Sequence, residues 1–391
     1  MIKELNPPVR TLMGPGPSTV SPQVLKAMAT PLLGHLDPKF LEIMNDTMDL
    51  LREVFETNNK LTMAMSGTGS SGMETIFVNL LEPGDKAIVC VHGLFGQRMA
   101  DVAGRTGATV ITVDAPWGQD VKPEQVKKAV AEHPDAKLVA IVQAETSTGV
   151  YQPLEDISKI VKDAGMLMLV DAVTSLGGME VGVGNYQIDA VYSGTQKNLS
   201  IPPGLSPVSF SQQAVDVISK RKTKVQSWYL DLTMIQNYWG SERFYHHTAP
   251  ISMVYALREG LRLIVEEGMA NVYRRHMTLG RALQAGLVAM GLELVVKDEA
   301  IRLPNLTSVL IPKGIADGDV RGRLLNEFDL EIGGGLGELK GKAWRIGLMG
   351  YACKKENVLL VLSALESILT EQGYNLDKGA ATAAASAAFH K

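Results

Sequence analysis

Short apolar runs alternate with segments of helical spacing between Leu61 and Phe210, and this alternation constrains the fold more than any other feature of the chain. An apolar run bounded by turn residues is typical of a buried strand, and strands separated by helices predict parallel pairing. The expected strands are Leu61–Met65, Lys86–Val91, Thr109–Val113, Leu138–Val142, Met166–Val170, Ala190–Tyr192 and Val208–Phe210, and the expected helices are Met73–Leu81, Gln97–Thr106, Pro123–Glu132 and Leu154–Ala164. The pattern predicts an α/β fold with a doubly wound, mostly parallel seven-stranded sheet flanked by helices.

The 391 residues allow more than one domain, and the character of the sequence changes along the chain. Residues 1–22 are rich in proline and glycine and predict an extended N-terminal arm. We expect a large domain over 23–265, which holds the sheet, and a small α+β C-terminal domain over 266–376. The alanine-rich tail, 377–391, is expected to be helical or frayed.

A long helical stretch, Ile251–Gly291, with a break near Gly268, is expected to bridge the two domains. The remaining elements of the small domain are expected at Leu292–Val296, Thr307–Ile311, Val320–Phe328, Leu330–Ile332, Trp344–Leu348 and Glu356–Thr370.

The composition excludes several classes of function. A net charge of −4 provides no basic surface for nucleic acid, and no apolar run is long enough to cross a membrane. The first residues do not resemble a signal peptide, and Cys90 and Cys353 form neither a metal spacing nor a disulfide framework, so we expect a cytoplasmic protein. His246 and His247 are adjacent and lie in no metal-ligand spacing, so we predict no metal site.

An acid and a lysine follow two of the expected buried strands. Asp171 ends the run Met166–Val170, and Lys197 lies in the small-residue turn after Ala190–Tyr192. Because the carboxyl ends of parallel strands line the ligand crevice of such a sheet, both groups are expected to face one ligand. A lysine that forms a Schiff base and an acid that pairs with a pyridinium nitrogen are the protein groups that pyridoxal phosphate requires. Alternatively, Asp171 caps the following turn and Lys197 is a solvated surface lysine.

The segment Gly67–Gly72 follows a strand and opens a helix, as an anion-binding loop does. It also satisfies the dinucleotide pattern G-x-G-x-x-G, but the next strand ends in Val91 and His92 without the acid that would bind a ribose. The hydroxyls of Thr68, Ser70 and Ser71 favour a phosphate monoester. A plain glycine-rich turn is the alternative.

Three further side chains fit a ligand at this edge. Phe95 follows a strand at a helix entry, where an aromatic ring is able to stack on a flat cofactor or to belong to the core. Thr146 follows the strand Leu138–Val142, where its hydroxyl is able to bind a ring hydroxyl or to form a turn. Arg345 lies among apolar residues, which indicates either capture of a carboxylate or an internal salt bridge.

Several motifs in order resemble those of one enzyme family over nearly the whole chain apart from the tail. They are Met13–Ser18, Ser66–Gly69, Gly96–Arg98, Glu145–Val150, Val170–Val173, Ser175–Gly178, Tyr192–Lys197, Tyr245–Thr248 and Arg345–Gly350. The chain resembles the class V (fold type I) pyridoxal-phosphate-dependent aminotransferases, and within them the alanine–glyoxylate / serine–pyruvate aminotransferase group.

The resemblance implies a role for each matching residue. Lys197 would form the Schiff base and shuttle the proton, and Asp171 would hold the pyridine nitrogen. Thr68, Gly69, Ser70 and Gln196 would bind the phosphate, and Tyr245 and Thr248 would reach the phosphate of the neighbouring subunit, so the active form would be a homodimer with shared sites. Thr146 would lie near the ring hydroxyl, Val173 below the ring and Phe95 on its face, where many relatives carry tryptophan. Arg345 would bind the substrate carboxylate, helped by the backbone up to Gly16, with Thr146 beside it.

One arginine, Arg345, suits a substrate with one carboxylate, and no second arginine in a recognisable motif argues for a dicarboxylate. We therefore expect transamination between a small amino acid, L-alanine or L-serine, and an oxo acid, glyoxylate or pyruvate. The alternative is an (S)-ureidoglycine–glyoxylate aminotransferase, a subgroup expected to carry amides where this chain has His35 and Trp228. A cysteine desulfurase, a nicotinamide dehydrogenase and a binding protein without turnover are weaker alternatives.

Overall fold

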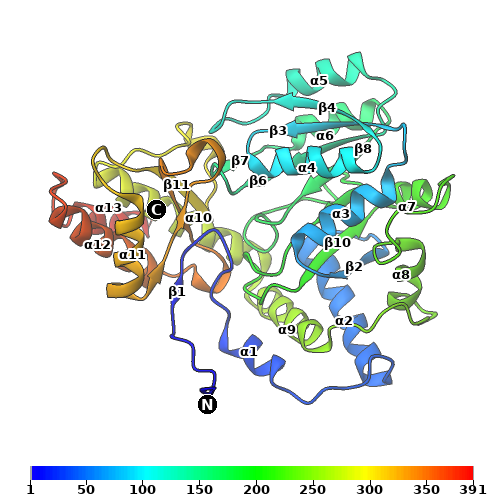
Figure 1. Cartoon of the computed structure of the whole chain (residues 1–391), viewed down its shortest axis with the longest axis horizontal. Helices are drawn as coiled ribbons and strands as arrows, with labels where there is room; N and C mark the ends of the chain where they lie inside the picture. Colours follow the sequence, from blue (N-terminus) through cyan, green and yellow to red (C-terminus); the bar gives the residue numbers. More distant parts are fainter. Residues whose placement is uncertain (1, 391) are drawn as a thin grey trace.

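The computed structural model describes residues 2–390 and contains the predicted seven-stranded sheet (Figure 1). Along the sheet the strands lie in the order β2 (Leu61–Ser66), β10 (Leu205–Phe210), β9 (Ala190–Tyr192), β8 (Leu167–Asp171), β5 (Leu138–Val142), β3 (Lys86–Val91) and β4 (Thr109–Asp114). Only β10 is antiparallel to its neighbours, so the other strands of this sheet all run the same way. The mostly parallel sheet expected from the alternation is confirmed.

Helices cover both faces of this sheet. They are α3 (Gly69–Leu80), α4 (Leu94–Arg105), α5 (Pro123–Glu132) and α6 (Glu155–Asp163), and α7 (Gln212–Ser219) follows β10. Because crossovers between parallel strands are right-handed, α3 and α4 lie on one face, and α5 and α6 lie on the other. In agreement, α3 packs beside α4, and α5 packs beside α6. The sheet core is therefore closed to solvent on both sides.

Four more helices belong to the half of the molecule that holds the seven-stranded sheet. They are α1 (Pro22–Met28), α2 (Pro38–Phe55), α8 (Leu232–Trp239) and α9 (Ile251–Glu267). The long stretch after Pro250 breaks at Gly268, as expected, and continues as α10 (Met269–Ala289). Val272 on α10 belongs to the larger hydrophobic core, whereas Leu279 and Leu283 belong to a second core, so α10 connects the two. The domain boundary at 265/266 stays a prediction.

The second core lies under a small antiparallel sheet with the order β11 (Leu306–Leu310), β14 (Ala343–Gly347) and β13 (Gly333–Gly334). Helices α11 (Asp317–Phe328), α12 (Lys355–Glu371) and α13 (Ala380–Ala388) complete this half. Within the alanine-rich tail, α13 is a packed helix, because Ala381 and Ala385 are buried in the second core.

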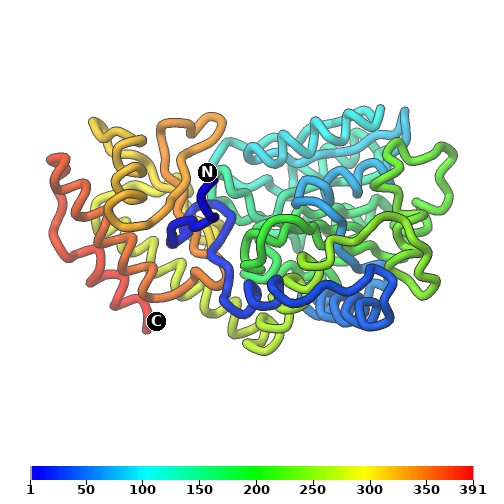
Figure 2. Tube along the Cα trace, turned by 60° about the horizontal axis from the view of Figure 1, so that its bottom comes forward, coloured from blue at the N-terminus to red at the C-terminus, as the bar shows by residue number. Residues whose placement is uncertain are grey.

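The N-terminal arm reaches across to the second core. Its residues Thr11–Leu12 form β1, which pairs in parallel with β12 (Leu330–Glu331), and Met13 is buried in the second core. Figure 2 shows the arm running over the junction between the two halves. The strand expected at Leu330–Ile332 therefore exists, but it pairs with the arm instead of the small sheet.

One expected strand, Leu292–Val296, is wrong. This segment lies along β11 but forms only an isolated bridge, from Leu294 to Val309. The chain then leaves the sheet because Asp298 caps a short 3-10 helix, Glu299–Ile301. Two further 3-10 turns, Gly337–Leu339 and Gly350–Ala352, and a short hairpin of β6 (Ala144–Glu145) and β7 (Val150–Tyr151) complete the described elements.

Candidate active site

The sequence-predicted residues converge at one edge of the large sheet. Strands β2, β3, β5, β8 and β9 are parallel, so the segments that follow them leave from the same edge. Thr68, Phe95, Thr146 and Lys197 lie in the segments after β2, β3, β5 and β9, and Asp171 is the last residue of β8.

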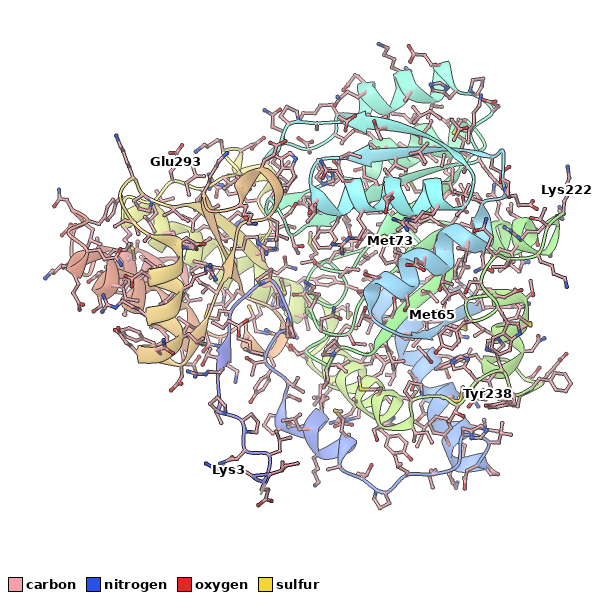
Figure 3. The ribbon with its side chains drawn as sticks, viewed as in Figure 1. Lys3, Met65, Met73, Lys222, Tyr238 and Glu293 are labelled. Carbon is pink, nitrogen blue, oxygen red and sulfur yellow. The ribbon has the colours of Figure 1, made fainter. Side chains whose placement is uncertain are left out.

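The loop after β2 is an open helix N-terminus. Thr68 is the N-cap of α3 but its side chain makes no capping hydrogen bond, and Thr68 and Ser70 are exposed. Met65 at the end of β2 and Met73 on α3 mark the two sides of this loop (Figure 3). Free amides and hydroxyls at a helix N-terminus form an anion site, so the geometry fits a phosphate group.

The same loop lies against the turns that carry the acid and the lysine. A Cβ atom added to Gly69 would lie 3.2 Å from Cγ2 of Val173 and 3.6 Å from Cα of Gly194. Gln196 lies beside Gly194, and its amide oxygen is buried without a hydrogen-bond partner among the described residues. An amide oxygen and a phosphate oxygen both accept hydrogen bonds, so the group of Gln196 that would face a phosphate is its Nε2 donor, which a rotation of the amide brings to this position.

Asp171 is the last residue of β8 and is buried. Its Oδ1 atom accepts from the backbone N–H of Val173 at 2.8 Å, and its Oδ2 atom accepts from the hydroxyl of Tyr192 at 2.6 Å. The turn-capping alternative is therefore realised. Each carboxylate oxygen retains a lone pair for a further donor. Burial raises the pKa of Asp171 to about 6, against the opposing effect of the Tyr192 hydrogen bond.

Lys197 is enclosed and not a surface lysine. Burial, and next the positive charge of Arg345, lower its pKa to about 8. Its ammonium donates to the carbonyl of Pro15 in the arm, and a Cβ added to Gly16 would lie 2.8 Å from Nζ. Gly16 has a φ of +103°, so both the conformation and the space at this position favour glycine. An amine with a depressed pKa suits nucleophilic attack on a carbonyl.

Phe95 and Thr146 follow the neighbouring strands β3 and β5 at the same edge of the sheet. Phe95 is half-buried in the first turn of α4, with the guanidinium carbon of Arg98 5.0 Å from the ring centroid. Thr146 is buried, and its carbonyl oxygen accepts from Nη1 of Arg345 at 3.2 Å. The hydroxyl of Thr146 makes no hydrogen bond within residues 2–390.

Arg345 reaches this edge from the small sheet. It is buried on β14, and its Nε atom donates to the carbonyl of Gly334 at 2.8 Å. Among residues 2–390, no carboxylate lies within ion-pair distance of Arg345, so the internal salt bridge is not formed. Burial lowers the pKa of Arg345 to about 10. A buried guanidinium without a counter-ion is a strong site for a ligand carboxylate.

Tyr245 and Thr248 are predicted site residues that the single chain does not bring to Lys197. Both are exposed in the segment before α9, and their hydroxyls lie 3.3 Å apart. No described hydrogen bond joins either residue to Asp171, Lys197 or the loop at Thr68. This placement is what residues that serve a neighbouring subunit require, but it does not test that role.

The sequence pattern does not predict two contacts of the site. Tyr192 is the register partner of Asp171 on β9, and its hydroxyl donates to Asp171. Glu145 has a buried carboxylate that caps the helix carrying Phe95. Both contacts join segments that are far apart in the sequence, so no local pattern indicates them.

The described residues hold no group of three or more histidine, cysteine, aspartate or glutamate side chains arranged for a metal ion. No helix in the described part of the chain has both the length and the apolar character to cross a bilayer. What the edge does hold is an enclosed lysine, a buried acid, an anion loop and a buried arginine, which together fit pyridoxal phosphate and a carboxylate substrate.

Comparisons with known proteins agree with this chemistry. Residues 12–355 match the family described as aminotransferase class-V. The structure superposes on a ureidoglycine–glyoxylate aminotransferase from Bacillus subtilis with a TM-score of 0.97 and 42% identity, covering 100% of both chains. An alanine–glyoxylate aminotransferase from Nostoc sp. gives 0.92 and 48%, covering 94% of this chain and 97% of that one. The alanine–glyoxylate aminotransferase of Felis catus is 41% identical over 94% of this chain and 90% of its own.

The fold and site therefore define an aminotransferase of fold type I, in which a large α/β domain is joined to a smaller α+β part. The chain belongs to the class-V aminotransferase family. The family implies pyridoxal phosphate as the cofactor, as the sequence predicted. The nicotinamide dehydrogenase and the protein without catalytic function are thereby set aside.

Proposed function

We propose that this enzyme transfers the amino group of a small amino acid, L-alanine or L-serine, to glyoxylate or pyruvate in a ping-pong cycle. The observation that carries the proposal is Arg345, a buried guanidinium with no counter-ion among the described residues. One such cation suits donors and acceptors that carry a single carboxylate. The alanine–glyoxylate aminotransferases of Nostoc sp. and Felis catus support glyoxylate as the acceptor.

Pyridoxal phosphate, when bound, supplies an aldehyde carbon that takes up the amino group and a ring that withdraws electrons from the substrate. Lys197 Nζ, uncharged above its lowered pKa, removes the proton from Cα of the donor and later returns one. Asp171 would keep the ring nitrogen protonated, and Phe95 would cover the ring face and exclude water. Thr68, Gly69, Ser70 and Gln196 would hold the phosphate, Val173 would support the ring, and Thr146 would bind the ring hydroxyl.

A second candidate is (S)-ureidoglycine–glyoxylate transamination. It is favoured by the Bacillus subtilis enzyme, whose similarity to this chain covers the whole of both chains. Two residues expected to distinguish the subgroups lie near the proposed partner-facing residues. The His35 ring lies 5.1 Å from the ring of Tyr245, and Trp228 stacks on His246 at 4.2 Å. The indole of Trp228, stacked on the His246 ring, offers no amide group to pair with the ureido group of (S)-ureidoglycine. This difference favours small amino acids as the donors.

A ranking of amino donors decides between the two candidates. We expect kcat/KM with glyoxylate to be highest for L-alanine or L-serine and at least tenfold lower for (S)-ureidoglycine, L-aspartate and L-glutamate. The Arg345→Gln variant should raise KM for every donor by about 10²-fold because it loses a buried charge-assisted pair. A preference for (S)-ureidoglycine would replace the first candidate by the second.

We further propose a homodimer in which Tyr245 and Thr248 complete the partner's site. The support is the exposure of aromatic side chains around them, namely Trp228, Tyr229, Phe244 and Tyr245. These residues belong to two short stretches, 228–229 and 244–245, which the stacking of Trp228 on His246 brings together. A cluster of exposed aromatic residues is typical of a surface that another protein covers. Sedimentation analysis of the purified enzyme should show a dimer, and a monomer with full activity would contradict the proposal.

A further inference from the structure

A buried carboxylate, Glu145, lies between the β6–β7 hairpin and the start of α4. Its Oε2 atom accepts from the backbone N–H of Phe95 at 3.0 Å and of Gly96 at 3.4 Å. Its Oε1 atom accepts from the backbone N–H of Ser147 at 3.0 Å and from the Ser147 hydroxyl at 2.6 Å. Four donors thus surround a side chain that is 0% exposed, and among the described residues it forms no ion pair.

These contacts cap α4 from a distant part of the chain. The N-cap residue of α4 is Gly93, which has no side chain to accept from the first amides of the helix. The hydroxyl of Ser147 accepts from the N–H of Leu94 at 2.9 Å, and Glu145 accepts from the next two amides. A Cβ on Gly93 would lie 2.4 Å from Cγ of Glu145, so glycine is needed for the carboxylate to reach the helix.

The capping also explains why α4 begins at Leu94, three residues before the start expected from apolar spacing. The negative charge lies at the positive end of the helix dipole, which stabilises both. Without this cap the first turn of α4 would lose its partners for buried amides. That turn carries Phe95.

The same segment connects to the substrate side of the site. Thr146 lies between Glu145 and Ser147, and its carbonyl accepts from Arg345. The charge of Glu145 also acts on Arg345, whose pKa it raises against the larger lowering caused by burial. One carboxylate therefore binds the backbone of Phe95 directly and is adjacent in the chain to Thr146, whose carbonyl accepts from Arg345.

We propose that Glu145 is a positioning residue that fixes Phe95 and Thr146 against the cofactor ring by capping α4 from the β6–β7 hairpin. The inference rests on the role proposed above for Phe95. It assigns to Glu145 no contact with substrate or cofactor.

The test is the affinity of the apoenzyme for pyridoxal phosphate in Glu145→Gln, Phe95→Ala and the double variant. Glutamine keeps the volume but turns one acceptor into a donor that faces backbone N–H groups. We expect the dissociation constant to rise about tenfold in each single variant, because buried donors lose their partner or the ring loses its cover. In the double variant the dissociation constant should rise by clearly less than the product of the two single effects, because Glu145 acts in part through Phe95.

Three further measurements make the outcome decisive. The circular dichroism of the bound cofactor's visible band should fall in Glu145→Gln, and Ser147→Ala, which keeps the carboxylate, should show a smaller fall. The surface variant Glu155→Gln should match wild type. If Glu145→Gln does not fold, Ser147→Ala replaces it in the same cycle with Phe95→Ala.

Two other outcomes would each contradict one of the proposed roles. An unchanged affinity in Phe95→Ala would overturn the role of Phe95 and, with it, the inference. If Phe95→Ala binds pyridoxal phosphate more weakly and the two substitutions have additive effects in the double variant, the positioning role of Glu145 is overturned and the role of Phe95 stands. The test measures cofactor binding and not activity with alanine or ureidoglycine. Its outcome therefore does not depend on which of the two proposed substrates is correct.

Discussion

At the scale of single residues, the charge state of Lys197 controls how the chain reacts with an aldehyde. The side chain is enclosed by Pro15 and Gly16 of the arm and lies in the positive field of Arg345. Both burial and this field favour the uncharged amine, and only the neutral amine is a nucleophile. The charged form dominates below the pKa and the reactive form above it.

The uptake of pyridoxal phosphate by the apoenzyme should therefore depend on pH. Because the pKa of Lys197 is about 8, the rate should rise roughly tenfold per pH unit below pH 8 and level off above it. Stopped-flow absorbance from about pH 6 to about pH 10 measures how the rate of cofactor uptake depends on pH. The Arg345→Gln variant should move the midpoint upward, since it removes a charge that lowers the pKa. A flat profile would contradict the assignment.

Removal of the amine itself should abolish turnover. We expect Lys197→Ala to lose roughly 10⁴-fold or more in kcat, because the nucleophile and the proton carrier disappear together. The variant should still bind pyridoxal phosphate through the loop at Thr68, as equilibrium dialysis would show. Lys159→Ala, a change at an exposed lysine on α6, is the matched control and should retain full activity. Substantial turnover by Lys197→Ala would refute the role.

At the scale of elements, α10 belongs to both hydrophobic cores. It therefore fixes how the half with the small antiparallel sheet packs against the half with the seven-stranded sheet. It contributes Val272 to the larger core and Leu279 and Leu283 to the second. The helix also passes close to the segment before β11, because a Cβ on Gly280 would lie 2.0 Å from the carbonyl oxygen of Pro304. Backbone atoms cannot yield as a flexible side chain does, so this contact requires glycine.

A methyl group at position 280 should therefore destabilise the protein. We expect Gly280→Ala to lower the free energy of unfolding by about 2 kcal/mol or more, since α10 must move away from Pro304. Gly322→Ala on α11 is the control, because nothing lies within 4 Å of its Cβ position. That change should stabilise by up to about 1 kcal/mol, as alanine favours the helix interior. Urea unfolding midpoints of the two variants should shift in opposite directions.

At the scale of the whole molecule, the proposed dimer places Lys197 and the pair Tyr245 and Thr248 of one site on different subunits. A subunit with Lys197→Ala still offers an intact Tyr245 and Thr248 to its partner. A subunit with Tyr245→Ala and Thr248→Ala still offers an intact Lys197. A heterodimer of the two therefore contains one complete site.

Mixing these two variants after dissociation, or producing them together, should restore activity. Random pairing makes half of the dimers heterodimers, so we expect about one quarter of wild-type activity, well above the activity of either variant alone at low cofactor concentration. Activity that equals the average of the two separate variants would show that each subunit's site is self-contained.

Local patterns were enough to predict the sheet and the common edge of Thr68, Phe95, Asp171 and Lys197, and anion binding by the loop at Thr68 stays a prediction. Apolar runs and helical spacing depend on near neighbours, and parallel strands necessarily place their carboxyl ends together. Helix starts were predicted less well. Helix α3 begins at Gly69 instead of Met73, because a helix begins at its capping turn and not at its first apolar residue.

The sequence by itself determined the fold class and which residues follow the parallel strands at the edge that carries Lys197. Only the tertiary structure decided which partner each of these groups has. Tyr192 donates to Asp171, and Lys197 donates to the carbonyl of Pro15. Glu145 caps α4, and β1 pairs with β12. Any of many hydroxyls, carbonyls or carboxylates satisfies a buried donor or charge equally well in chemical terms. The packing of segments far apart in the chain selects the one that lies within hydrogen-bond distance.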